Sequence, residues 1–232
     1  VETINVARQP GEARVQVLVE VDGEAGDDAG VGRVVGRQAD SGDDWGRGAG
    51  EVEIEQAYIE HELSGTARLR AGLFLMPSGL LNENHEPTRY YGVFRNFVET
   101  AIIPSTWREG GVGFQGNTAG GLRWDAGVTT GFDLSKWDPA SGEGTESPLG
   151  SIHQELALAR AAQLSTYVAA NYTGIGGLRV GASIFSGGAS QRQAGLASSR
   201  VTLWEGHARW QPGAWDLSAL YARGHISGTA AL

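Results

Sequence analysis

The sequence predicts an all-β protein: an antiparallel transmembrane β-barrel, of which the 232 residues form a single, incomplete domain of about nine strands. Three features predict it. Apolar and polar residues alternate within many segments, the connections between these segments are short and long in turn, and large aromatic residues lie near the short connections. Alternation with a period of two is the pattern of a strand whose two faces meet different surroundings. We expect strands at about 12–21, 50–63, 66–76, 109–117, 121–132, 158–173, 178–187, 199–211 and 214–225.

The segment 122–132 shows the alternation most clearly. Its even positions carry Leu, Trp, Ala, Val, Thr and Phe, and its odd positions carry Arg, Asp, Gly, Thr and Gly. Its 11 residues match the roughly 9–11 that a tilted strand needs to cross a bilayer. The same alternation recurs in 15–21, 67–75, 164–172 and 178–184.

The connections between the strands alternate in length. Short turns, rich in Gly, Asn, Ser and Pro, lie at 64–66, 117–121, 173–177 and 211–214. Long polar segments lie at 22–49, 78–109, 133–160 and 187–199. Outer-membrane barrels have tight periplasmic turns and longer outside loops, so the connection lengths favour a membrane barrel over a soluble β-sandwich or β-solenoid.

Large aromatic residues lie near the ends of the expected strands. Trp124, Tyr172, Trp210 and Trp215 lie within a few residues of short turns, and Phe132 lies at the opposite end of its strand. Amphipathic rings gather at membrane–water interfaces. We therefore expect these five residues to form lipid-interface girdles, whereas the core of a sandwich would place large rings more often in the middle of a strand.

The composition excludes several classes of protein. The net charge of −9 argues against a nucleic-acid-binding protein, which normally carries a basic stripe. The absence of Cys removes disulfides, thiolate nucleophiles and Cys-based zinc sites. No run approaches the 18 apolar residues that indicate a transmembrane helix.

One segment departs from the barrel pattern. Residues 75–114 read LMPSGLLNENHEPTRYYGVFRNFVETAIIPSTWREGGVGF. In GLF at 72–74, PSG at 77–79, NENHEP at 82–87 and IPSTW at 103–107, the chain resembles outer-membrane porins of the phosphate-selective type and their unassigned relatives. The resemblance implies a passive channel, often trimeric, in which a long loop, here 78–109, folds toward the pore.

Charged residues of this loop and of the polar strand faces are candidates to line the pore. An arginine against lipid costs about 2–4 kcal/mol at the midplane, so barrel charges are expected to face the lumen. The candidates in the strands are Arg68, Arg70, Arg123, Asp125, Arg179, Glu205, His207 and Arg209. Those in the loop are Glu83, Glu86, Arg89, Arg95, Glu99 and Glu109.

These charges allow more than one interpretation. Arg68 and Arg70 share a face and suit an arginine ladder for anions. Alternatively, the arginines pair with Asp125 and Glu205 in a balanced lumen. The loop itself either lines a constriction, or forms a surface lid with solvated charges, or is held together by internal salt bridges.

The sequence predicts no metal, no cofactor and no enzymatic activity. His85 lies beside Glu83 and Glu86 but has no second histidine at a zinc-binding spacing. No G-x-S-x-G elbow accompanies the Ser, His and Asp residues.

The function that we expect is that of a porin of the bacterial outer membrane, through which small hydrophilic solutes diffuse passively. If the arginines form a ladder, the porin is expected to prefer anions. The expected partners are membrane lipid, lipopolysaccharide, the solutes and two further copies in a homotrimer, but not nucleic acid. One alternative is a structural or adhesive outer-membrane barrel with partner-binding loops. Another is a soluble β-rich domain that binds carbohydrate by stacking sugars on Trp107, Trp124, Trp204 and Trp210.

Overall fold

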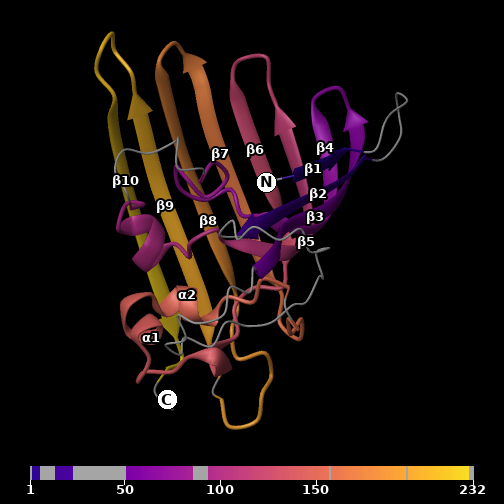
Figure 1. Ribbon diagram of the computed structural model, residues 1–232, viewed down its shortest axis with the longest axis vertical. Coiled ribbons are helices and arrows are strands. Elements are labelled where there is room, and N and C mark those ends of the chain that lie inside the picture. The colour runs from indigo at the N-terminus through magenta and orange to yellow at the C-terminus, as the bar shows by residue number, and fades with distance from the viewer. Residues whose placement is uncertain are drawn as a thin grey trace, which may run out of the picture.

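A computed structural model describes residues 2–5, 14–22, 51–85, 94–156, 158–196 and 198–229. These residues form one antiparallel sheet of ten strands in which each strand pairs with its neighbours in sequence (Figure 1). The strands are β1 (Glu2–Asn5), β2 (Arg14–Asp22), β3 (Glu51–Ser64), β4 (Ala67–Leu75), β5 (Arg108–Asn117), β6 (Leu122–Thr129), β7 (Ser165–Ile175), β8 (Leu178–Gly188), β9 (Arg200–Trp210) and β10 (Leu217–Ser227). The all-β prediction is confirmed.

The nine expected strands correspond to β2–β10. The four residues of β1 were not expected, because so short a segment shows no readable alternation. The expected strand at 158–173 begins only at Ser165, after Leu158, which has a left-handed φ of 53°. Within the described residues β1 and β10 are the edges of the sheet, and no pairing joins them.

The four short hairpin turns lie together at one end of the sheet, at the top of Figure 1. The long connections from β4 to β5, β6 to β7 and β8 to β9 leave from the other end, and their described residues are 76–85, 94–107, 130–156, 158–164, 189–196 and 198–199. They contain α1 (Gly142–Glu146), α2 (Pro148–Ile152) and the helical turns Val98–Ile102 and Leu134–Lys136. The long segment 22–49 lies largely outside the described residues, as do the candidates Glu86 and Arg89.

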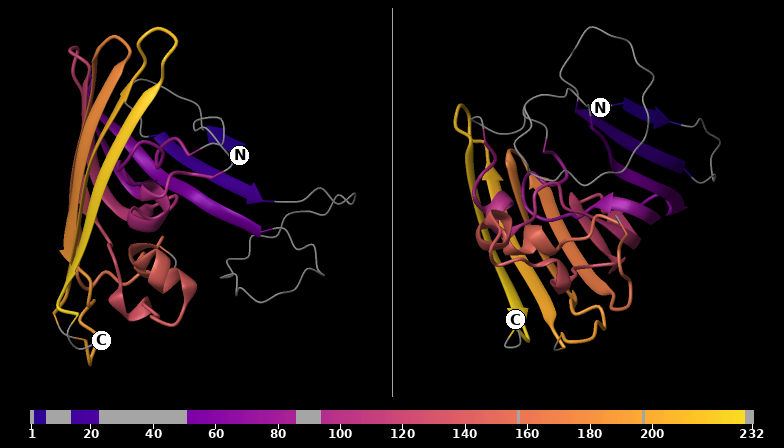
Figure 2. Two further views of the ribbon diagram at one scale, coloured as in Figure 1. Left: turned by 90° about the vertical axis from the view of Figure 1, so that its left-hand side faces the viewer. Right: turned by 60° about the horizontal axis from the view of Figure 1, so that its bottom comes forward.

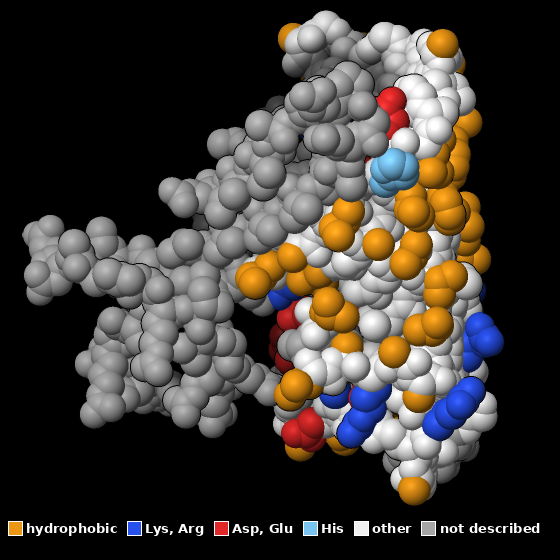
Figure 3. Space-filling model, turned by 90° about the vertical axis from the view of Figure 1, so that its right-hand side faces the viewer, with side chains coloured by type: hydrophobic (Ala, Val, Ile, Leu, Met, Phe, Trp, Pro, Cys, Tyr) orange, Lys and Arg blue, Asp and Glu red, His pale blue; other side chains and the backbone are white. Residues whose placement is uncertain are grey.

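The two faces of the sheet differ in chemistry. One face, here called the outer face, exposes large apolar side chains, among them Ile59, Phe114, Val128, Val168, Ile184, Trp204 and Tyr221. Figure 3 shows apolar side chains gathered in a band over one side of the sheet, with most of the basic side chains below it. The opposite, inner face carries Arg70, Asp125, Tyr167, Glu205 and His207, which are all buried. The division between odd and even positions follows the predicted alternation.

The sheet is curved, and the long connections fold back against its inner face (Figure 2). The largest buried side chains lie between that face and these connections. Trp107 stacks on Phe132 with ring centroids 5.5 Å apart, and Phe185 of β8 meets both rings edge-on at 4.8 and 5.3 Å. No helix among the described residues has the length and apolar character to cross a bilayer.

Phe132 does not lie in an exposed girdle, so that expectation was wrong. Its side chain is 1% exposed and belongs to the inner core. Strand β6 ends at Thr129, and Gly131 follows with φ +73°. The amide of Gly131 donates to the Glu109 carboxylate. This turn ends the alternation and directs Phe132 inward.

Candidate functional site

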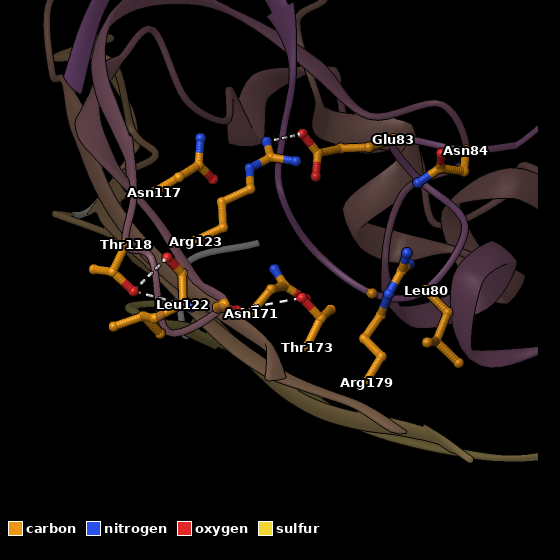
Figure 4. A pocket seen from close by; sticks show the side chains of 12 residues that line it. Leu80, Glu83, Asn84, Asn117, Thr118, Leu122, Arg123, Asn171, Thr173 and Arg179 are labelled. Atoms are coloured by element: carbon orange, nitrogen blue, oxygen red, sulfur yellow. Dashed lines mark hydrogen bonds and ion pairs between the residues drawn. The ribbon is translucent and has the colours of Figure 1, made fainter. Parts of the chain in front are cut away.

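A cavity of about 240 Å³ lies on the inner face beside the short turns. Segment 79–84 forms one wall, and the ends of β5–β8 form the other (Figure 4). The charged groups that line it are Glu83, Arg123 and Arg179. The other lining residues are Gly79, Leu80, Asn84, Asn117, Thr118, Gly121, Leu122, Asn171 and Thr173.

Asn82 fixes the wall formed by segment 76–85. Its side-chain amide donates to the carbonyls of Met76 and Trp107, both at 2.8 Å. Its Oδ1 accepts from the Trp107 amide at 2.7 Å. One buried side chain therefore joins the two ends of the connection between β4 and β5, just beyond the last pair of the two strands, where the Met76 amide also donates to the Trp107 carbonyl at 2.9 Å.

Glu99 supports the same wall from behind. Its carboxylate accepts from the Leu81 amide at 2.6 Å and from Asn96 Nδ2 at 2.5 Å. Gly79 has φ +76°, and a Cβ there would overlap the Glu99 carboxylate, so only glycine fits. Glu99 is 3% exposed. This candidate pore residue holds the loop together through hydrogen bonds to neutral amides, rather than through the internal salt bridges that one alternative expected.

A chain of alternating charges crosses the inner face. Arg70 lies 3.6 Å from Asp125, which is 3.1 Å from Arg123 Nε, and Arg123 Nη2 reaches Glu83 at 2.6 Å. Arg70 and Asp125 are buried, whereas Arg123 and Glu83 are partly exposed. Buried charges are stable only when paired, so this chain locks segment 79–84 onto β6.

The neighbouring strands carry a second polar group. His207 Nδ1 lies 2.9 Å from Glu205 and its Nε2 lies 2.9 Å from Asn171 Oδ1. Arg209 makes two hydrogen bonds to Asp216, at 2.9 and 2.5 Å. Arg179 stands opposite Arg209 in the register of β8 and β9.

The structure brings only some of the candidate residues together. Arg123 and Arg179 line the cavity, and Asp125 and Arg70 lie behind Arg123. Arg68 pairs instead with Glu60 at 3.6 Å, and Arg95 donates to Thr106.

Glu109 is enclosed rather than lumen-facing. It is completely buried and accepts hydrogen bonds from Trp107 Nε1, Thr130 and the Gly131 amide. Its partners lie in the two connections that leave the sheet beside β5. Its position therefore suits a structural role in the core.

The neutral cavity residues were not singled out from the sequence. Asn117, Arg123 and Asn171 stand side by side in the register of β5, β6 and β7. The sequence feature that could have indicated these residues is that each of them lies close to a short turn. Without the register, that feature does not distinguish a site from a solvated turn.

A second charged cluster lies at the long-loop end, outside the strands except for Arg108. Glu155 bonds His153 Nε2 at 2.7 Å and Arg108 Nη2 at 3.1 Å. Glu155 and Leu156 have left-handed φ values of 52° and 59°, which are strained for residues other than glycine. A Cβ at Gly110 would overlap Leu156, so the segment lies tightly over β5. We call this group the rim clasp.

The rim clasp is strongest in the pH range in which His153 is protonated and Glu155 is ionised. Burial lowers the pKa of His153, but the hydrogen bond to Glu155 outweighs it and raises that pKa above 6.5. Burial raises the pKa of Glu155, but His153 and Arg108 outweigh it and hold it below 4.5. The histidine contribution is complete below pH 6.5 and is lost as pH rises through its raised pKa. The glutamate contribution is complete above pH 4.5 and is lost as pH falls through its lowered pKa.

We expect proteolytic cleavage near Leu156 to accelerate as the pH rises through the pKa of His153. Loss of a charge-assisted hydrogen bond of about 1.5 kcal/mol corresponds to roughly tenfold faster cleavage when opening is at equilibrium. The measurement is limited proteolysis at pH 6 and pH 9, normalised to an unfolded peptide of the same sequence. His153→Gln should remove the pH dependence; an equally steep dependence in that variant would contradict the role of the clasp.

Comparison with known proteins adds one relationship. No family model matches the chain. An uncharacterized protein of Aquifex aeolicus (strain VF5) is 32% identical over 182 residues, which cover 78% of this chain and 40% of the relative. The chain thus spans about two fifths of the relative's length, and the relative's name assigns no activity.

Proposed function

We propose that the chain is part of a bacterial outer-membrane β-barrel that lets small hydrophilic solutes diffuse passively. The observation that carries the proposal is the outer face of the sheet. Large exposed apolar side chains occur on β3 and on every strand from β5 to β10. The charged chain from Arg70 to Glu83 lies on the opposite face.

A lipid environment accounts for such a face better than water does. The largest apolar patch on a soluble monomer is about 300–600 Å². A soluble β-sandwich covers its apolar face with a second sheet at about 10 Å. Here the packed core lies on the inner side, and the outer side chains such as Val168 are half exposed.

The aromatic residues near the short turns also support the proposal. Trp210, Trp215 and Tyr172 are exposed close to these turns, and Trp124 is partly buried against Gly116. Such rings suit the boundary between headgroups and hydrocarbon. A complete barrel also needs partners for the edges β1 and β10, because unpaired backbone groups are costly in lipid. Further strands would supply them in the full-length protein.

A second candidate is a structural or adhesive barrel with a closed lumen. The observation that favours it is the packing of Trp107 and Phe132 against Phe185, which fills part of the inner face. The anion preference, the homotrimer and the contact with lipopolysaccharide expected from the sequence remain predictions.

Planar-bilayer recording of the full-length protein distinguishes these candidates. The diffusion pore predicts stepwise increases in conductance, which heat-denatured protein does not produce. Insertion into lipid vesicles without conductance would favour the closed barrel. Failure to associate with lipid, together with equal gel migration of boiled and unboiled samples, would overturn the membrane assignment.

A further inference from the structure

We infer that the cavity at the short-turn end binds a small polyhydroxylated monocarboxylate, of the size of a single sugar acid, with Arg179 holding the carboxylate. The inference deepens the proposed function and rests on it for the route by which the ligand arrives. It does not rest on it for the binding itself, because the lining residues that carry the argument all belong to the described part of the chain.

Arg179 is the cation that this cavity leaves uncompensated. It forms no hydrogen bond or ion pair with the described residues, whereas Arg123 pairs with both Glu83 and Asp125. Arg209, opposite Arg179, already has its own carboxylate in Asp216. Figure 4 shows Arg179 rising from β8 toward the segment that carries Leu80 and Asn84. A guanidinium in such a place offers a planar fork that matches a carboxylate.

The charges around the cavity favour a ligand that carries one negative charge. The chain behind the cavity contains Arg70, Asp125, Arg123 and Glu83, two of each sign. Of the charged groups that line the cavity, Arg123 is paired with Glu83, so Arg179 supplies the positive charge of this lining that has no carboxylate partner among the described residues. A second negative charge on a ligand would approach Glu83, which lines the cavity. The site thus favours a monoanion over a dianion of similar size.

The neutral lining favours hydroxyl groups over an aliphatic chain. The side-chain amides of Asn84 and Asn117 make no hydrogen bond with the described residues, and the Glu83 Oε2 likewise has none. Asn171 gives only its Oδ1 to His207. The apolar side chains of the lining are those of Leu80 and Leu122. Asn84 and Asn117 are exposed, so water solvates their amides when the cavity is empty. An aliphatic chain would displace this water without replacing its hydrogen bonds, whereas ligand hydroxyls would replace them.

The size of the cavity limits the ligand. Pockets for drug-sized molecules measure about 300–1,000 Å³. The 240 Å³ available here suit a single sugar ring or a six-carbon chain. The cavity is too small for an oligosaccharide.

The test is calorimetric titration of the full-length protein, folded in detergent micelles, with D-gluconate and D-glucuronate as probes. Glucose tests the need for the charge, hexanoate the need for hydroxyls, and inorganic phosphate the preference for a carboxylate. We expect saturable binding of the two sugar acids and at least about tenfold weaker binding of the three comparison compounds.

Arg179→Gln should weaken gluconate binding by roughly tenfold or more, as expected for loss of a charge-assisted pair. Arg192→Gln is the control, since Arg192 is exposed in the connection between β8 and β9 and is not among the lining residues of the cavity. Arg179→Lys keeps the charge without the fork and should give an intermediate affinity. Gel mobility of unboiled samples shows whether each variant is folded.

Unchanged affinity in folded Arg179→Gln, or phosphate or hexanoate binding as tightly as gluconate, would overturn the inference. The titration needs no pore. A protein that binds gluconate without conducting would contradict only the diffusion function, and one that conducts without binding would contradict only the ligand site.

Discussion

Val168→Arg lowers the free energy of unfolding in lipid vesicles by about 2–4 kcal/mol if the outer face of the sheet meets hydrocarbon. Val168 is 54% exposed on β7, in register with Ile184 of β8, which is 48% exposed. At an exposed position in water the same change is worth within about 0.5 kcal/mol, because the guanidinium stays solvated. The two environments therefore predict effects that differ several-fold.

Leu217→Arg is the matched control for this prediction. Leu217 is 49% exposed, but it begins β10 directly after a short turn. Near an interface an arginine costs about 0–1 kcal/mol, because its head reaches water. The measurement is denaturant unfolding in vesicles, followed by tryptophan fluorescence. Equal, small effects of the two variants would remove the main support for a membrane-embedded sheet.

Asn82→Ala should release segment 76–85 from the inner face of the sheet. The change removes three hydrogen bonds. The carbonyls of Met76 and Trp107 each keep a backbone donor, whereas the Trp107 amide loses the acceptor that Asn82 provides. A buried polar group left unsatisfied costs about 1–3 kcal/mol. The variant should therefore lose about 1–3 kcal/mol of stability, and its segment should become sensitive to protease. In a bilayer, its single-channel conductance should rise because the segment no longer fills the inner face.

Asn84→Ala provides the comparison within the same segment. Asn84 is exposed, and its side chain makes no hydrogen bond with the described residues. Its replacement should change stability by less than about 0.5 kcal/mol. Protease resistance and conductance equal to wild type in both variants would show that Asn82 does not hold the segment in place.

Most strands were predictable because alternation and turn chemistry are local properties. In β6, neighbouring side chains point to opposite faces whatever the rest of the chain does, so Val128 and Asp125 were assigned to opposite sides correctly. The same reasoning failed at Phe132, because the turn at Gly131 lies beyond the strand and depends on Glu109, 22 residues earlier.

The candidate site was only partly predictable, because the sequence shows where the charged residues are but not which of them pair with one another. Arg123 and Arg179 were both candidates on polar faces. The first is neutralised by Glu83, 40 residues earlier in the chain, and the second is left open to the cavity. Glu99 was an equally good candidate to line a pore, but its hydrogen bonds are made to residues of its own loop.

The sequence alone thus determined the strands, their two faces and the alternation of short and long connections, since each follows from residues next to one another. Only the tertiary structure decided which charges are buried and paired, which side chain enters the core and where a cavity remains. These outcomes depend on the return of segment 76–85 across the inner face, where Asn82 and Glu83 contact residues far away in the sequence. Contacts of that range depend on strand register and on loop path, which no local pattern specifies.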